Sequence, residues 1–166
     1  MEQVNFFENN LCYEKVEIAY LLHKKIINER LPFADVQHVG SSAIPNSLTK
    51  GDLDIQVRVT LEQFPIAVQT LEALYELNEG SSKTDCFRAF KDNSTVPALG
   101  VQLTVINSEV DFFWKFREVL LINDKYRKEY DDIKRNYEGK EMDKYREAKS
   151  EFFGKLMETP EFRKLK

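Results

Sequence analysis

The run from Asp52 to Val59 constrains the fold more than any other stretch of this chain. Polar and apolar residues alternate along it, as they do in a β-strand with one buried face. Successive side chains of a strand point to opposite faces, so the polar ones share a face: Asp52, Asp54, Gln56 and Arg58. The pattern therefore predicts a strand with two carboxylates on one face, about 7 Å apart.

A short polar turn precedes this strand. Residues 35–39 are predicted to form another strand, which delivers His38 to Gly40, Ser41 and Ser42. Small residues let backbone N–H groups converge and serine hydroxyls donate hydrogen bonds, so such a turn suits an anion. Paired carboxylates suit Mg²⁺, which takes one or two of them and leaves its other positions to water and phosphates. Interpreted as scaffold, the same residues are a turn and the solvated face of a sheet.

The order of these features resembles the nucleotidyltransferase superfamily, in which a Gly-Ser turn is followed by paired acids on the next strand. Individual residues are similar to those of the GrpB family, a group within that superfamily. They are His38–Pro45, Lys50, Asp54, Ile55, Phe116, Arg117, Tyr145, Ala148 and Lys149. The similarity covers most of the chain, and most members of the family are uncharacterised.

This resemblance implies an α+β fold: a nucleotidyltransferase-like small mixed β-sheet with an N-terminal helix and three C-terminal helices. It implies a single domain over residues 1–166, with the sheet core in 1–107 and a helical part in 108–158. It further implies a site in which Asp52 and Asp54 are catalytic and bind Mg²⁺ or Mn²⁺. The nucleotide- or phosphate-binding residues would be His38, Gly40, Ser41, Ser42, Lys50, Arg58 and Arg88, with Gln102 and Thr104 as neighbours.

Two functions follow from that site. The first is transfer of a nucleotidyl group from a nucleoside triphosphate to an acceptor, with the metal and the phosphate-binding side chains stabilising the transition state. The second is a non-catalytic module that binds a nucleotide or another phosphate ester and has kept the fold. A third alternative is an adaptor that acts through its C-terminal helices, which would need an exposed apolar patch.

Departures from the family pattern bear on this choice. GrpB members usually have an apolar residue where this chain has Asp52, so the acid pair is more like that of active nucleotidyltransferases. The His-x-His strand of the family is Gln102-Leu103-Thr104 here, which removes two potential ligands or bases. A third carboxylate has no clear counterpart, and the candidates are Asp85 and Asp92.

Helical periodicity accounts for much of the remaining sequence. The predicted helices span 13–30, 61–77, a segment that begins at Ser108, 123–137 and 141–157, and further strands span 86–91 and 100–106. Ser108 and Asp111 resemble a helix start signal. The alternating charges between Lys125 and Lys155 are typical of a solvated helix face, and the tyrosines of these helices are expected to pack.

Composition narrows the partners. The chain has 28 acidic and 24 basic residues and a net charge of −4, which argues against bulk nucleic-acid binding because that needs a clustered basic face. Two cysteines, Cys12 and Cys86, predict a reduced, cytoplasmic protein. No apolar stretch approaches the roughly 18 residues of a membrane span. We therefore expect a phosphate-bearing small molecule, such as a nucleoside triphosphate, as the partner.

Overall fold

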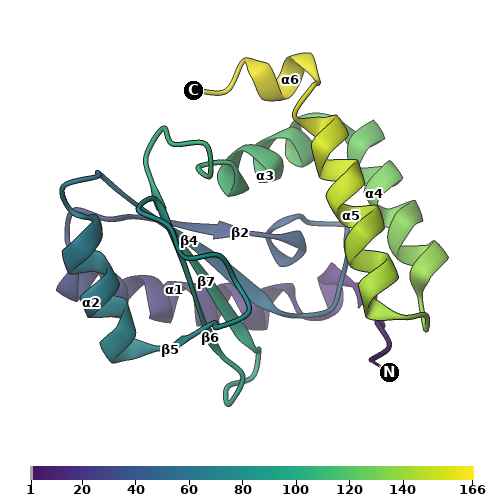
Figure 1. Ribbon diagram of the computed structural model, residues 1–166. Helices are drawn as coiled ribbons and strands as arrows, with labels where there is room; N and C mark the ends of the chain where they lie inside the picture. The colour runs from purple at the N-terminus through teal and green to yellow at the C-terminus, as the bar shows by residue number, and fades with distance from the viewer. Residues whose placement is uncertain (1) are drawn as a thin grey trace.

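The computed structural model describes residues 2–166 (Figure 1). The strands are β1 (Phe7–Glu8), β2 (Asp35–Val39), β3 (Leu48–Thr49), β4 (Leu53–Val59), β5 (Glu76–Leu77), β6 (Phe87–Asp92) and β7 (Leu99–Val105). The helices are η1 (Asn9–Leu11), α1 (Tyr13–Arg30), η2 (Ser41–Ala43), α2 (Phe64–Leu74), α3 (Phe113–Ile122), α4 (Asp124–Tyr137), α5 (Met142–Leu156) and α6 (Pro160–Arg163).

Five strands form a mixed sheet in the order β2-β4-β7-β6-β5. β4 and β7 are parallel, and the other neighbours are antiparallel. The register places Asp54 beside Val39 of β2 and Gly100 of β7. The α+β fold and the mixed sheet predicted from the sequence are thus confirmed. β1 and β3 form a separate two-stranded ribbon.

Apolar and polar side chains alternate along β4 as predicted, so the strand presents an apolar face to one side of the sheet and a polar face to the other. Leu53, Ile55, Val57 and Val59 are at most 1% exposed and pack in one core with α1 and α2. Burying such side chains contributes about 1.5–3 kcal/mol each. The other face of β4 carries polar residues toward the C-terminal helices, which lie on the far side of the sheet from α1 (Figure 1).

The helix predicted over 61–77 is shorter at both ends in the structure, where α2 spans Phe64–Leu74. α2 ends at Leu74 because Tyr75 is extended, and the chain then enters β5. Thr60 and Gln63 form reciprocal hydrogen bonds just before the helix: the Gln63 side chain accepts from the Thr60 N–H at 3.0 Å, and the Gln63 N–H donates to the Thr60 hydroxyl. The C-terminal part adds a short fourth helix, α6, where Pro160 occupies the first turn and Thr159 caps it.

Three charged residues of α4 hold the C-terminal helices to the loop before β3, and we call them the α4 clasp: Arg127, Asp131 and Lys134. Arg127 donates to the Asn46 carbonyl at 3.1 Å. Asp131 accepts from the Ser47 hydroxyl at 2.7 Å and the Leu48 N–H at 3.0 Å. These bonds join α4 to the loop before β3.

Lys134 is the unusual member of the clasp, since its side chain is fully buried. Its ammonium donates to the Ser47 hydroxyl and the Leu48 carbonyl, and it lies 3.8 Å from the centroid of the Tyr130 ring. Burial lowers the pKa of Lys134 from 10.5 to about 7, although Asp131 opposes the change, and Lys149 and Arg135 add to it. The sequence pattern predicted a solvated helix face here and is wrong for this residue.

The free energy of unfolding should therefore depend on Lys134 above neutral pH. Below about pH 7 both states carry the proton, whereas from there to about 10.5 only the unfolded chain does, so stability rises with pH. The slope is at most roughly 1.4 kcal/mol per pH unit. Lys134→Met should remove this slope in urea titrations between pH 7 and 9. Lys128→Met, on an exposed site of α4, is the control. An unchanged slope in Lys134→Met would contradict the assignment.

Candidate functional site

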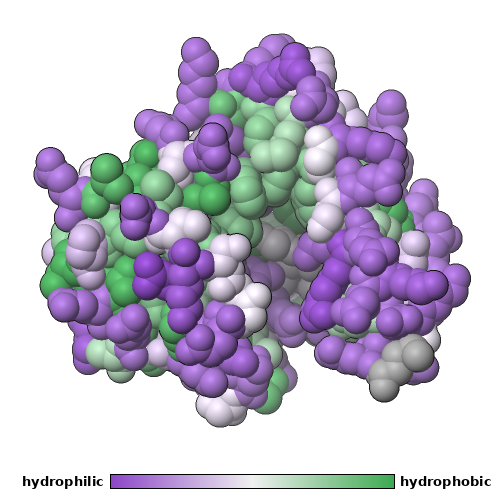
Figure 2. Space-filling model, in the orientation of Figure 1, coloured by the Kyte–Doolittle hydropathy of each residue, from purple (hydrophilic) through white to green (hydrophobic). Residues whose placement is uncertain are grey.

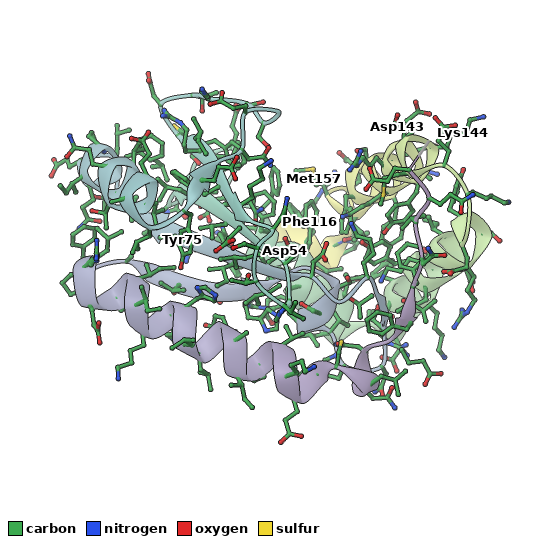
Figure 3. All side chains as sticks on the ribbon, turned by 90° about the horizontal axis from the view of Figure 1, so that it is seen from below. Asp54, Tyr75, Phe116, Asp143, Lys144 and Met157 are labelled. Carbon is green, nitrogen blue, oxygen red and sulfur yellow. The ribbon has the colours of Figure 1, made fainter. Side chains whose placement is uncertain are left out.

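A cavity of about 610 Å³ lies between the sheet and helices α3, α4 and α5. Figure 2 shows it as a hollow between the half of the molecule that holds the sheet and the half that holds the C-terminal helices. Asp54 from β4, Phe116 from α3 and Met157 after α5 all lie toward it (Figure 3). Its size is within the range of small-molecule sites.

The lining has a polar floor, an aromatic wall and a cationic side. The floor includes Gly40, Ser41, Asp54 and Gln102; the wall includes Phe112, Phe113, Phe116, Leu120, Tyr130, Phe153 and Met157; the cations are Arg117, Arg146 and Lys149. The floor residues were all predicted as site residues or their neighbours. The aromatic residues were predicted to pack, and the charges of α5 were predicted to face solvent. The available signal for Phe116, Arg117 and Lys149 was their similarity to GrpB sequences.

Asp54 occupies a space that two glycines leave open. Gly40 has φ +77°, and a Cβ atom there would lie 2.5 Å from Asp54 Oδ2. A Cβ atom on Gly100 would lie 2.9 Å from Asp54 Oδ1 and 3.3 Å from Gln102 Nε2. The carboxylate therefore lies between two backbone segments that carry no side chain. No hydrogen bond joins it to another residue within 2–166.

The surroundings of Asp54 shift the pKa of its carboxyl group upward. Burial raises the pKa of Asp54 most. The positive charge of Lys149 is the next largest influence and opposes the rise, the negative charge of Asp52 adds to it, and Lys50 lowers it. Lys149 is thus the cation that acts most strongly on the carboxylate in the cavity.

Asp52 does not reach the cavity lining. It lies just before β4, its side chain is 44% exposed, and it forms an ion pair of 3.5 Å with Lys50. The structure therefore brings one of the two predicted acids into the cavity and leaves the other, with Lys50, outside it. Within residues 2–166, no group of three or more His, Cys, Asp or Glu side chains could hold a metal ion.

This donor set does not fit a metal that the protein alone would hold. Mg²⁺ prefers near-octahedral oxygen ligands, and here a single carboxylate lines the cavity. Asp85 and Asp92 do not complete it, because neither lines the cavity, and Asp92 accepts hydrogen bonds from Ser94 that lower its pKa. Binding of Mg²⁺ or Mn²⁺ together with the phosphates of a nucleotide stays a prediction.

Hydrogen-bonded contacts among three side chains, Ser42, His38 and Glu17, hold the Gly-Ser-Ser turn in place. Ser42 is 1% exposed and shares a hydrogen bond of 3.0 Å with His38 Nε2, while His38 Nδ1 lies 3.2 Å from Glu17 of α1. Burial lowers the pKa of His38, Glu17 raises it, and Arg117 lowers it. The trio has the order of a hydrolase triad. Because Ser42 is buried and absent from the cavity lining, its geometry serves to hold the turn.

Of the two serines, Ser41 is the one that lines the cavity, as part of its floor. Its hydroxyl donates to Thr49 at 3.1 Å, and Thr49 also accepts from the Gly51 N–H. The two predicted hydroxyl donors thus have different surroundings, since Ser42 faces His38. A direct contact of His38 or Ser42 with a phosphate stays a prediction that the burial of both side chains does not favour.

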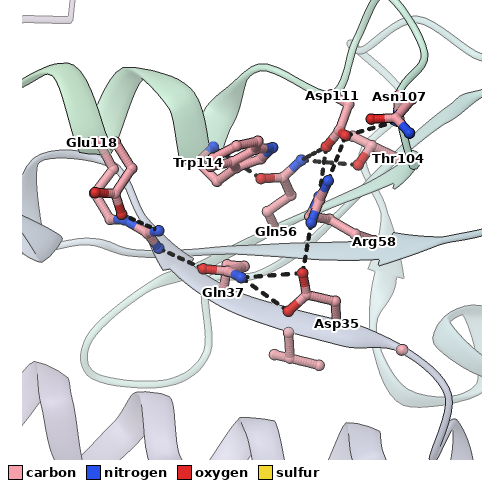
Figure 4. A network of polar contacts seen from close by, with 12 residues as sticks. Asp35, Gln37, Gln56, Arg58, Thr104, Asn107, Asp111, Trp114 and Glu118 are labelled. Atoms are coloured by element: carbon pink, nitrogen blue, oxygen red, sulfur yellow. Dashed lines mark hydrogen bonds and ion pairs between the residues drawn. The ribbon is translucent and has the colours of Figure 1, made fainter. Parts of the chain in front are cut away.

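Arg58 belongs to a buried polar network beside the cavity (Figure 4). Its guanidinium binds both carboxylate oxygens of Asp111 and one of Asp35, each at 2.7 Å. Gln56 donates to Asp111 and to the hydroxyl of Thr104, which is fully buried. These residues join the sheet to the start of α3. They are not part of the cavity lining.

The same network corrects the predicted start of the first C-terminal helix. The helix begins at Phe113, and Asp111 does not cap it. The Asp111 carboxylate instead accepts from Arg58, Gln56 and the Asn107 N–H. Burial raises the pKa of Asp111, but the hydrogen bonds from Arg58 and Asn107 leave it lowered overall. The residue predicted as part of a start signal is an arginine-binding carboxylate.

Arg88 lies away from the cavity. Its guanidinium donates to the carbonyls of Phe87 and Thr84 and lies 5.8 Å from the centroid of the Phe64 ring, at α2. Of the residues predicted as a site, the structure therefore gathers Gly40, Ser41, Asp54 and Gln102, and it leaves the others in scaffold contacts or at the surface.

A sequence model of the family described as GrpB protein matches residues 13–159. This chain belongs to the GrpB family. A UPF0157 protein of Vibrio cholerae is 31% identical over 160 residues, which cover 94% of this chain and 83% of that protein. Both findings confirm the family resemblance seen in the sequence.

Solved structures confirm the GrpB-like fold. The conserved protein GrpB from Enterococcus faecalis superposes with a TM-score of 0.72 at 19% identity, covering 96% of this chain and 98% of that one. A Cid1 poly(U) polymerase superposes with a TM-score of 0.53 at 14% identity, covering 74% of this chain and 40% of the polymerase. The nucleotidyltransferase-like core is therefore shown. Among the described residues, no helix combines the length and apolar character needed to cross a bilayer.

Substitution of Gly40 tests the steric arrangement around Asp54. Gly40→Ala should lower the free energy of unfolding by about 1–3 kcal/mol, because it places a Cβ at positive φ and against the Asp54 side chain. Gly154→Ala, at an open helical position, should raise stability by roughly 1 kcal/mol. Urea unfolding of both variants measures the difference. Equal stability of Gly40→Ala and the parent would contradict this geometry.

Proposed function

We propose that this GrpB protein is a binding module for a nucleotide, or another phosphate ester with a ring system, held in the cavity between sheet and C-terminal helices. The observation that carries the proposal is the position of Lys149. It lines an aromatic cavity and has no hydrogen-bond or ion-pair partner within residues 2–166, whereas Arg117 and Arg146 are paired with Glu118 and Asp143. A half-buried ammonium without a partner suits an anionic ligand.

The aromatic wall supports the ring of such a ligand. Phe116 lies 5.2 Å from Phe112 and 4.5 Å from Phe153 between ring centroids, so three rings form one continuous surface. Stacking of a base on an aromatic side chain contributes about 1–3 kcal/mol. The Cid1 poly(U) polymerase that superposes on this chain is bound to magnesium and 3′-dATP, which supports a nucleotide in a core of this topology.

The anion-binding role of Lys149 can be measured by thermal unfolding with a panel of nucleotides. A ligand at 100 times its dissociation constant adds about 2.7 kcal/mol, which raises Tm by about 5–10 °C. Lys149→Met should weaken binding by about 10- to 100-fold, since hydrogen bonds to charged groups contribute roughly 1.5–3 kcal/mol. Lys155→Met, on an exposed site of α5, should bind like the parent. If Lys149→Met and Lys155→Met bound the nucleotide with equal affinity, Lys149 would not be the anion-binding residue and the proposal would be contradicted.

A second candidate is nucleotidyl transfer, favoured by the presence of Asp54 and the Gly40-Ser41 turn in the same cavity of a nucleotidyltransferase-like core. The single carboxylate and the absence of a metal-binding cluster within residues 2–166 support binding without turnover. The two candidates make opposite predictions for the isosteric change Asp54→Asn.

Under the binding proposal, Asp54→Asn keeps the ligand-induced rise in Tm, and Mg²⁺ is not required for it. Removal of a charge that repels phosphate should leave affinity equal or higher. Calorimetric titration with and without Mg²⁺ measures both effects, with Asp92→Asn outside the cavity as the control. Mg²⁺-dependent release of pyrophosphate that Asp54→Asn abolishes and Asp92→Asn retains would favour transfer instead.

A further inference from the structure

The charges that line the cavity leave little capacity for a polyanion. Arg117 is bound to Glu118 at 2.7 Å and also donates to Gln37 and to the His38 carbonyl. Arg146 is 59% exposed and pairs with Asp143 at 3.2 Å, so solvent and salt screen it. Lys149 is the lining cation without such a pairing among the described residues.

The same cavity contains one negative charge, and it lies on the floor. Asp54 has no counter-ion in contact within residues 2–166, and Lys149 is the cation whose charge opposes the rise in its pKa most. A phosphate that binds Lys149 compensates the ammonium. A second or third phosphate meets Asp54, the aromatic wall or the solvent-screened Arg146. Burying an uncompensated charge against apolar side chains is strongly unfavourable.

We propose that the cavity selects ligands with a single phosphate, so that a nucleoside monophosphate binds more tightly than the corresponding diphosphate or triphosphate when no divalent cation is present. This inference rests on the proposed function and names its ligand class. The phosphate binds Lys149, and the ring occupies the surface formed by Phe112, Phe116 and Phe153. Asp54 acts as the residue that discriminates against additional phosphates.

Calorimetric titrations in EDTA with adenosine, AMP, ADP and ATP, and with the guanosine, cytidine and uridine series, test this order. For the base that binds, the monophosphate should bind at least tenfold more tightly than the triphosphate. Asp54→Asn should bring the affinities for the monophosphate and the triphosphate closer together, because it removes the repulsion between the carboxylate and the additional phosphates without changing the size of the side chain. Lys149→Met should reduce the affinity for the monophosphate to that for the nucleoside. Lys155→Met should leave the affinities for the monophosphate and the nucleoside unchanged.

Each outcome has a distinct meaning. A triphosphate that binds as tightly as the monophosphate without a cation overturns the selection and leaves the proposed function standing. An unchanged ratio in Asp54→Asn overturns the role given to Asp54. If no nucleoside or nucleotide of the four series binds the parent protein, the proposed nucleotide site and this inference both fail.

Discussion

The alternation of apolar and polar side chains along β4 is the constraint on which the rest of the structure depends. One set of its side chains forms the dry layer with α1 and α2, and that layer fixes the strand in place. Because side chains alternate along a strand, the polar side chains of β4 point to the other face of the sheet. Asp54 faces the cavity there, while Gln56 and Arg58 face the loop that leads into α3. A strand with period two cannot shift by one residue without exchanging these two faces.

The second constraint is the way in which polar groups join the layers. Arg58 binds Asp111 on one side of the cavity, and the α4 clasp binds the loop before β3 on another. The carboxylates of Asp111 and Asp131 are buried and both contacts are charge-assisted, so they resist separation of the helices from the sheet. The cavity is thus a gap whose two sides are held at fixed positions, which suits a preformed ligand site.

Local patterns in the sequence were sufficient for the sheet and most helices, because burial of β4 and the apolar stripes of the helices follow simple periods. The sequence also indicated Gly40, Ser41 and Asp54 as site residues and Gln102 as a neighbour, and the structure places all four in the cavity lining. The sequence did not separate Asp54 from Asp52, since their different surroundings depend on Lys50 and on the position of β4 relative to β7. Nor did it reveal the burial of Lys134 or the pairing of Arg58 with Asp111, which are contacts between distant segments.

The two glycines beside Asp54 give the cavity floor an uncommon property. Most buried carboxylates are oriented by hydrogen bonds, and those bonds also occupy their lone pairs. Here the positions of Gly40 and Gly100 limit where the carboxylate can lie, while its hydrogen-bonding capacity is not used by residues 2–166. The group is therefore preorganised by shape alone. An arriving donor meets an acceptor that is already in place and has no internal bond to give up.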